Sequence, residues 1–332
     1  MHMSDALVSP QVALGVGTVA AVLIATAIKR VKPYINEQLP LMGVLGAFVF
    51  AAQMINFTIP GTGSSGHITG GILLASLLGP WAAFLVLCSV LIIQCFLFAD
   101  GGILALGCNM VNMAAISCLI AYPMIFAPFN RGSHNTIGRI TLLSILTCLV
   151  SGVLGAVMVT IETEFSGITA LPTAEFLSFM LPIHVVIGLM EGVATAAVLG
   201  MIMKSRPDLL DNTNHNHNTI IPLTLLTLTS LLVAGVLSLL ASSSPDGLEW
   251  SIMNVTRGEE VVATGVLHNM ADTVQQTTAL LPDYNSSWAG IVGSLLLIVC
   301  ALIVTYMLRR RPHSRSQSCH PHAEPHSSHE KE

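Results

Sequence analysis

The chain has 332 residues, of which 53% are hydrophobic and only 9% charged, and its mean hydropathy is +0.74. This composition is too apolar for a soluble domain around an ordinary core, and it predicts a polytopic membrane protein. The net charge of -5 gives no indication of a nucleic-acid partner, because in a membrane protein the positions of the lysines and arginines carry the information.

The chain opens with MHMSDALVSP, and no Lys or Arg precedes Lys29. No small-residue cleavage site closes the first apolar stretch, so we expect no cleaved signal peptide. Methionine aminopeptidase acts efficiently only on a small second residue, and His2 is not small. We therefore expect Met1 to be retained, with a free terminal amine directly before His2.

Crossing a bilayer as a helix takes about 20 apolar residues. Counting stretches of that order predicts an all-α membrane bundle whose first module has seven segments, at residues 11–28, 39–57, 68–79, 80–98, about 103–127, 140–161 and 179–203. The third segment is short because the sequence LGPW interrupts a long apolar run. The stretch ADGGILALGCN is predicted to contain a turn, and Glu162, Glu164 and Glu175 a loop.

The polar linker at 206–218 separates this first module, residues 1–205, from a second module at 219–308. The second module has two predicted spans, 220–240 and 288–308, around an external segment that begins SPDGLEW. A histidine-rich tail occupies 309–332, for which weak metal binding and a solvated tail without a site remain open.

With the amino terminus outside, 12 of the 13 lysines and arginines fall on the cytoplasmic side, and only Arg257 lies outside. This arrangement satisfies the positive-inside rule. We therefore predict a multi-pass protein of the cell (inner) membrane with an external amino terminus and a cytoplasmic carboxyl terminus. His2 and His67 then lie on the same outer face.

A terminal amine, the amide nitrogen of residue 2 and the imidazole of His2 can wrap one metal ion in fused five- and six-membered chelate rings. His67, at the end of the glycine-rich run GTGSSGH, is the candidate for a fourth nitrogen. Planar nitrogen coordination suits Cu(II) or Ni(II), whereas zinc prefers a tetrahedron. The alternative is that His2 is an exposed terminal residue and His67 an ordinary loop histidine.

Four runs, MHMSDALVSP, SSGHITGGILLASLLGPWAAFLV, ADGGILALGCNMVNMA and HVVIGLMEGVATAAVLG, resemble the CbiM/NikM family. These proteins are the substrate-binding membrane subunits of energy-coupling-factor (ECF) transporters for cobalt and nickel. The resemblance covers residues 1–205, and the PDGLE sequence at 245–249 resembles the domain of the companion CbiN/NikN subunits. The whole chain therefore resembles a NikM and NikN fusion.

The resemblance implies that the metal is bound by Met1 through its amine, by His2 through its amide and ring, and by His67 through its ring. It further implies that the glycine-rich loop closes over the metal, and that Asn109 and Asn112 belong to a structured loop supporting the site.

The resemblance also implies partners: a pair of ATP-binding cassette ATPases and a transmembrane coupling subunit, of the NikO/NikQ or CbiO/CbiQ type. The chain itself contains no GxxxxGK[ST], HExxH or GxSxG motif, so we expect a transporter subunit and not an enzyme.

The opening MHMSDA is nearer to the nickel branch than the MHIPDG typical of the cobalt branch, so Ni(II) is the expected transported ion. Co(II) is the alternative by family and Cu(II) the alternative by chemistry. A membrane metal sensor or enzyme is the remaining alternative, although four planar nitrogen ligands leave no equatorial position for a substrate.

Several other polar residues lie near the predicted site. Asp5 and Asp100 are both candidates to orient His2 or His67 by accepting a ring N–H. A helix cap or turn is the alternative for each, and it is the favoured interpretation for Asp100, which precedes two glycines. Asn109 and Asn112, three residues apart, would share one helix face and either join helices or serve the site.

Two ionisable residues fall within the predicted span 179–203. Glu191 needs a polar partner there, and packing against partner subunits or a buried hydrogen bond is expected. His184 is expected to form an interfacial hydrogen bond, with an accessory metal contact as the alternative. The cysteines form no CxxC pair, and all but Cys319 are expected to be packing residues.

Overall fold

The computed structural model describes residues 1–130, 136–205, 241–284 and 288–309, together with the isolated Leu228, Leu232 and Gly235. The predicted linker, the tail from residue 310 and, apart from those three residues, the predicted span 220–240 lie outside the described part of the chain.

The first module is helical, as predicted, and its helices follow the seven predicted segments in order. They are α1 (Pro10–Val31), α2 (Ile35–Gln53), α3 (Gly71–Leu78), α4 (Pro80–Phe98), α5 (Leu106–Asn109), η2 (Met110–Phe126), α6 (Ala127–Phe129), α7 (Ile137–Ser166) and α8 (Thr173–Ser205). The helices α5, η2 and α6 are continuous over Leu106–Phe129, and η2 is of the π type. The all-α fold class is therefore confirmed.

Local signals explain where two of these helices begin. The Ser9 side chain accepts a hydrogen bond from the Val12 N–H and Pro10 opens α1, which is a favourable helix start. Gly79, at φ +79°, ends α3, and Pro80 begins α4 directly after it. The LGPW sequence therefore divides a long apolar run into two helices.

The loop predicted around Glu162, Glu164 and Glu175 is wrong. The first two residues lie in α7 and the third in the first turn of α8, so the connection is only 167–172. Glu162 is buried within α7, where it accepts a 2.6 Å hydrogen bond from Asn112 Nδ2. Because its carboxylate has a buried partner, the helix continues past the acidic residues.

Five of the described helices are long and apolar enough to cross a membrane: Pro10–Val31, Pro80–Phe98, Leu106–Phe129, Ile137–Ser166 and Thr173–Ser205. Two shorter apolar stretches, Gln38–Gln53 and Ala289–Ile303, lie in α2 and α12. These helices give the chain the composition of a multi-pass membrane protein.

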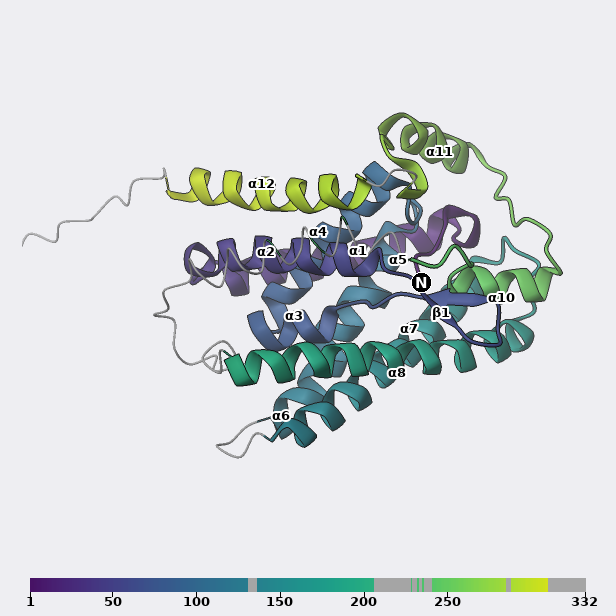
Figure 1. The fold of residues 1–332 in the computed structure, drawn as a ribbon. Coiled ribbons are helices and arrows are strands. Elements are labelled where there is room, and N and C mark those ends of the chain that lie inside the picture. The colour runs from purple at the N-terminus through teal and green to yellow at the C-terminus, as the bar shows by residue number, and fades with distance from the viewer. Residues whose placement is uncertain are drawn as a thin grey trace, which may run out of the picture.

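The second module contributes α10 (Gly247–Thr256), α11 (Val266–Thr278), η5 (Pro282–Tyr284) and α12 (Ala289–Arg309). The helix α12 lies along α2, where Gly43 faces Ala301 and Gly293 faces Phe50 with no room for a Cβ. The helices α10 and α11 lie at the end of the bundle that holds the amino terminus (Figure 1).

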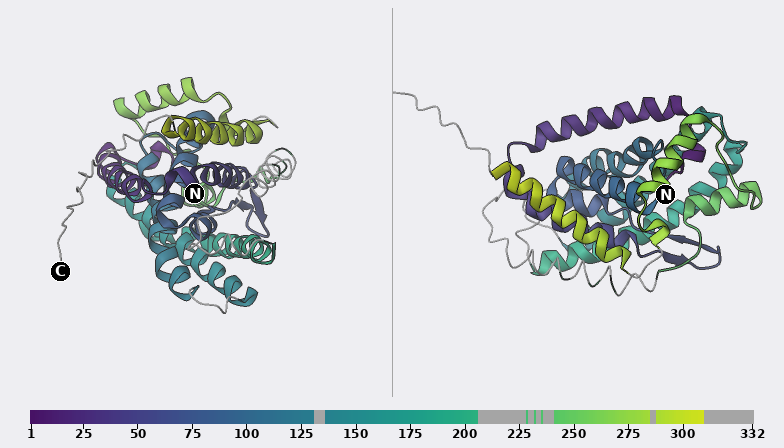
Figure 2. Two further views of the ribbon diagram at one scale, coloured as in Figure 1. Left: turned by 90° about the vertical axis from the view of Figure 1, so that its left-hand side faces the viewer. Right: turned by 90° about the horizontal axis from the view of Figure 1, so that it is seen from above.

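The bundle has two distinct ends. At one end lie the amino terminus, the short helix η1 (Asp5–Leu7) and the antiparallel strands β1 (Phe57–Ile59) and β2 (Ser64–Gly66) (Figure 1). The carboxyl ends of α8 and α12 lie at the other end. Seen along the helices, the amino terminus lies near the middle of the cross-section of the bundle (Figure 2).

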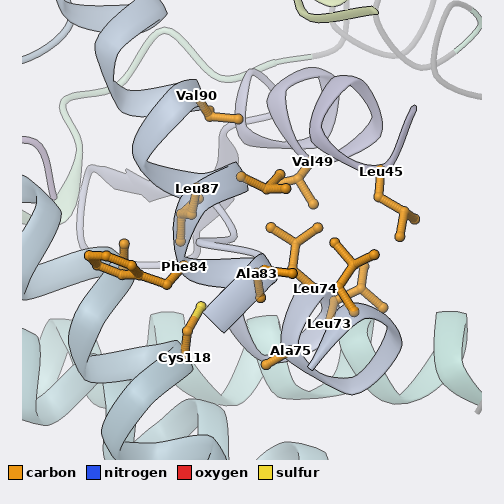
Figure 3. Packing of buried hydrophobic residues seen from close by; sticks show 14 of the residues in the cluster. Leu45, Val49, Leu73, Leu74, Ala75, Ala83, Phe84, Leu87, Val90 and Cys118 are labelled. Carbon is orange, nitrogen blue, oxygen red and sulfur yellow. The ribbon is translucent and has the colours of Figure 1, made fainter. Parts of the chain in front are cut away.

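The core surrounds the short helix α3, all eight residues of which are buried. Leu45 and Val49 of α2, Phe84 of α4 and Cys118 of η2 pack around it (Figure 3). Five free cysteines are buried, in keeping with a packing role: Cys88, Cys95, Cys108, Cys118 and Cys148. This buried apolar core lies below the end of the bundle that holds the amino terminus and the two strands.

Candidate metal centre

The first residues of the chain run as an extended segment into the bundle. The Met3 N–H donates to Asn109 Oδ1 at 2.7 Å, and Asn109 Nδ2 donates back to the Met3 carbonyl at 3.1 Å. The Gly102 N–H also donates to that carbonyl, at 2.9 Å. Met3 is fully buried, so these bonds fix the two residues before it inside the protein.

The structure brings Met1, His2 and His67 together. The Met1 amine nitrogen lies 3.1 Å from His67 Nε2. The rings of His2 and His67 are stacked with their centroids 5.2 Å apart and their planes at 21°. His67 directly follows β2, and the pairing of Gly66 with Phe57 fixes its approach to the amine.

The two imidazoles are enclosed, and this changes their protonation. Burial lowers the pKa of His67 to about 3, and the charge of the nearby amine acts in the same direction. Burial is also the main reason why the pKa of His2 lies below its ordinary value. Both rings are therefore neutral near pH 7 and keep a lone pair that a metal ion can use.

Two polar side chains hold the His2 ring. His2 Nδ1 lies 3.1 Å from Asp100 Oδ1, and His2 Nε2 lies 3.2 Å from Gln94 Oε1. Gln94 in turn donates to Gln53 Oε1 at 2.8 Å, and Gln53 donates to the Thr69 carbonyl, also at 2.8 Å. A neutral ring has one N–H, so His2 donates either to Asp100 through Nδ1 or to Gln94 through Nε2. With the proton on Nε2, a chain of hydrogen bonds links His2 to the segment that follows His67.

Sequence reasoning did not select Gln94 or Gln53, although an amide in an apolar helix is a signal for a buried polar contact. It kept Asp5 and Asp100 both open as partners of a histidine ring, but preferred Asp5. Asp5 Oδ1 accepts from the Ala105 N–H at 3.0 Å and so fixes the turn before α5. The carboxylate that contacts the His2 ring belongs to Asp100.

Asn109 and Asn112 lie on the helices α5 and η2, and not in a loop as the resemblance implied. Asn109 holds the amino-terminal segment through Met3. Asn112 joins two helices through Glu162, with its Nδ2 also 3.5 Å from Met3 Sδ. Asn109 therefore holds the amino-terminal segment, whereas Asn112 bonds two helices to each other.

Asp246, of the PDGLE sequence, is a further member of the site. Its Oδ2 accepts from the Met1 amine at 2.5 Å, while its Oδ1 accepts from the N–H groups of Leu248 and Glu249 at the start of α10. Burial acts to raise the pKa of Asp246, but the amine and His67 outweigh it and hold that pKa below its usual range. The contact joins residues 245 positions apart, so no local pattern could indicate it.

A cavity of about 530 Å³ opens beside these groups, and its lining includes His2, His67, Asp100, Asp246 and Glu249. Among the described residues, no group of three or more His, Cys, Asp or Glu side chains is placed to hold a metal ion. A site that uses the terminal amine and a backbone amide needs only two such side chains, so the arrangement fits the chelate predicted from the sequence.

Glu191 and His184 lie deeper in α8. Glu191 accepts from Thr69 Oγ1 at 2.8 Å and from the Gly70 N–H at 2.9 Å, which is the buried hydrogen bonding expected of it. His184 Nδ1 lies 2.8 Å from the Met180 carbonyl one turn earlier, so this bond is within the helix and not interfacial. A cavity of about 20 Å³, enough for one water molecule, separates them from Met1 and His67.

Two family models match the chain. The model described as the cobalt uptake substrate-specific transmembrane region, CbiM, matches residues 2–209, and the PDGLE domain matches residues 221–310. The chain belongs to the CbiM family. The resemblance to CbiM/NikM proteins with a fused PDGLE domain is thereby confirmed.

Similar proteins cover this CbiM chain to different extents. The probable fused nickel transport protein LarMN of Lactiplantibacillus plantarum is 31% identical, over 93% of this chain and 97% of its own length. The cobalt transport protein CbiM of Sorangium cellulosum is 30% identical, over 52% of this chain and 76% of its own.

A crystal structure of a truncated transition metal transporter aligns with a TM-score of 0.54 and 30% identity, over 61% of this chain and 99% of that one. This CbiM protein is therefore a membrane component of nickel or cobalt transport, and a transport protein rather than an enzyme.

Proposed function

We propose that this protein captures Ni(II) at the outer face of the cell membrane, as the substrate-specific component of an ECF importer. The ligands are the Met1 amine, the amide nitrogen and Nδ1 of His2, and Nε2 of His67. The observation that carries the proposal is the 3.1 Å separation between the amine nitrogen and His67 Nε2, with the His2 ring stacked alongside.

The observed spacing suits planar coordination. Two nitrogens at adjacent corners of a square, each about 2.0 Å from a metal, are about 2.8 Å apart, close to the spacing of the amine and His67. The six-membered chelate ring closes through His2 Nδ1, which in the structure faces Asp100. Metal binding therefore replaces this contact and releases one amine proton and one amide proton.

Nickel is favoured over cobalt by two considerations. Four nitrogen donors in a plane suit Ni(II) and Cu(II), which stabilise a deprotonated amide ligand. The relative that covers nearly the whole chain is named as a nickel transport protein. Co(II) remains the alternative substrate, because another relative is named as a cobalt transport protein.

The basic residues support an external amino terminus. Lys29 and Arg30 close α1, Lys204 closes α8, and Arg309 ends α12. The closing ends of α8 and α12 lie opposite the amino terminus, and the view from above shows the same for α1 (Figures 1 and 2). That basic end is cytoplasmic in this proposal.

Residues 1–205 form the metal-binding module and 219–308 the companion module, joined by the linker 206–218 and followed by the tail 309–332. ATP hydrolysis is supplied by ATP-binding cassette ATPases, coupled through a transmembrane subunit. Moving His67 away from the amine breaks the chelate and releases the ion inward.

The proposal is tested by metal content and visible absorption of the purified protein after exposure to Ni(II), Co(II) or Cu(II). We expect one equivalent of Ni(II) with the spectrum of a planar complex. A variant extended by two residues before Met1 displaces the amine without placing His2 third in the chain, where a new planar terminal chelate would form. This variant should lose the binding with every side chain intact. Normal binding by the extended variant would show that the amine is not a ligand. His184→Ala, which removes a nearby histidine outside the ligand set, is the matched control and should bind.

A further inference from the structure

The segment that carries the PDGLE sequence covers the metal site. The Ser65 N–H donates to the Pro245 carbonyl at 2.8 Å, and Trp250 Nε1 donates to the Thr62 carbonyl at 2.9 Å. On the first module, these bonds are made by Thr62 in the turn before β2 and by Ser65 in β2, and this stretch leads directly to His67. The PDGLE segment, residues 244–250, is therefore bonded to the hairpin that supplies one of the proposed ligands.

The glycine of this sequence allows the segment to approach α8 closely. A Cβ at Gly247 would lie 2.7 Å from Ile187 Cδ1 and 3.3 Å from His184 Cε1. With glycine at this position the start of α10 packs against α8 without displacing the Ile187 side chain, and Figure 1 shows α10 beside α8 and the strands. This close approach of α10 places the neighbouring Asp246 next to the Met1 amine.

The two oxygens of Asp246 serve two partners at once. Oδ1 accepts the first N–H groups of α10, and Oδ2 accepts the Met1 amine at 2.5 Å. The side chain is only 16% exposed. Asp100 and Glu249 also line the adjoining cavity, but Asp100 faces the His2 ring and Tyr284, and Glu249 faces the Asp246 N–H. Asp246 is the carboxylate that touches the amine.

A charge count, which rests on the proposed function, shows why this position matters. The metal-free site contains one ammonium charge. Binding of Ni²⁺ adds two charges and releases two protons, one from the ammonium and one from the amide, so the loaded site also has a net charge of +1. An enclosed positive charge is costly unless a negative group is adjacent. The terminus without metal can move away from this enclosed position, whereas the bound chelate is held there by His67.

We propose that Asp246 is the counter-charge of the metal site, through which the PDGLE segment sets how tightly the site holds its metal. Asp246 is a positioning residue and not a ligand. Its carboxylate receives the amino terminus when the site is empty and neutralises the chelate when the site is full. The segment at 244–250 thereby makes the second module part of the binding site formed by the first.

The test is a Ni(II) titration of the purified full-length protein in competition with a chelator. Asp246→Asn removes the charge, while asparagine caps a helix as well as aspartate does, so α10 keeps its start. We expect the dissociation constant for Ni(II) to rise by about 10- to 100-fold, as for loss of a partner that supports a ligand. Asp246→Glu retains the charge and should recover part of the affinity.

Glu249→Gln is the matched control, because it removes one negative charge from the same sequence without touching a ligand. It should change the dissociation constant by less than about fivefold, as expected for a partly exposed charge. Wild-type affinity in Asp246→Asn, or an equal loss in Glu249→Gln, would overturn the proposal. If the wild-type protein binds no Ni(II) that depends on His67, the proposed function fails first. The melting temperature of each metal-free variant reports whether the fold is kept.

Discussion

The end of the bundle that holds the amino terminus and the body of the bundle are built from different contacts. At the first, polar bonds join residues far apart in the chain, such as the Met1 amine with His67 and with Asp246. In the body, glycines bring backbones together: a Cβ at Gly188 or Gly192 of α8 would lie within 3 Å of backbone atoms of α7. The comparison indicates that substitutions at the terminal end affect binding, whereas those in the body affect folding.

The largest effect is expected for His67→Ala. This change removes one of four proposed ligands, so high-affinity Ni(II) binding should be abolished, a loss beyond the ~10- to 100-fold typical of an outer partner. The amine retains Asp246 as a partner, so the fold should persist. Metal content and the melting temperature of the metal-free protein measure the two quantities separately. Unfolding of the metal-free His67→Ala variant would contradict the proposed difference between the two regions.

Asn109→Ala tests how the terminal segment is held. The side chain makes two hydrogen bonds to Met3, the residue directly after the proposed ligands. Without them the terminus samples positions away from His67, and Ni(II) affinity should fall by about tenfold or more. Asn112→Ala is the matched control, since its amide serves mainly Glu162, and it should reduce the melting temperature more than the affinity.

How far the sequence leads depends on whether the signal is local. The helix at 80–98 was located correctly because Gly79 and Pro80 mark its start. The ends of α7 and α8 were misplaced, since the acceptance of Glu162 inside a helix depends on Asn112, which is 50 positions away. The positive-inside rule placed His2 and His67 on one face, and in the structure their rings are stacked.

The supporting residues of the site show the limit of that reasoning. Both Asp5 and Asp100 fall near the predicted outer boundary, and only the path of the chain after Met3 decides that Asp100 meets His2. The PDGLE sequence was recognised as a unit, but its contact with the amine depends on how the second module folds back over the first. Residue spacing along the chain contains no information on either contact.

Close packing of α8 against α7 in the body of the bundle can be tested by substituting alanine for glycine at two positions of α8. A Cβ at Gly192 would lie 2.5 Å from Ile145 Cα, whereas Gly200, in the same helix, has open space around it. Gly192→Ala should therefore lower the free energy of unfolding by about 1–3 kcal/mol through overpacking. Gly200→Ala should be neutral or slightly stabilising, because alanine favours a helix. Thermal melting in detergent distinguishes them, and equal melting temperatures would refute close α7–α8 packing.

Glu191→Gln is expected to change Ni(II) affinity least among the substitutions near the site, and it is informative because Glu191 contacts both regions. It lies in the long helix α8, yet its carboxylate holds Thr69 and Gly70, which follow His67 almost directly. Glutamine preserves the shape but weakens these bonds, since hydrogen bonds to a charged group exceed neutral ones by about 1 kcal/mol. We expect Ni(II) affinity to fall about two- to fivefold, measured by the same competition titration. A fall in melting temperature with unchanged affinity would assign Glu191 to the body alone, whereas a change in affinity at an unchanged melting temperature would make it the connection by which α8 positions His67.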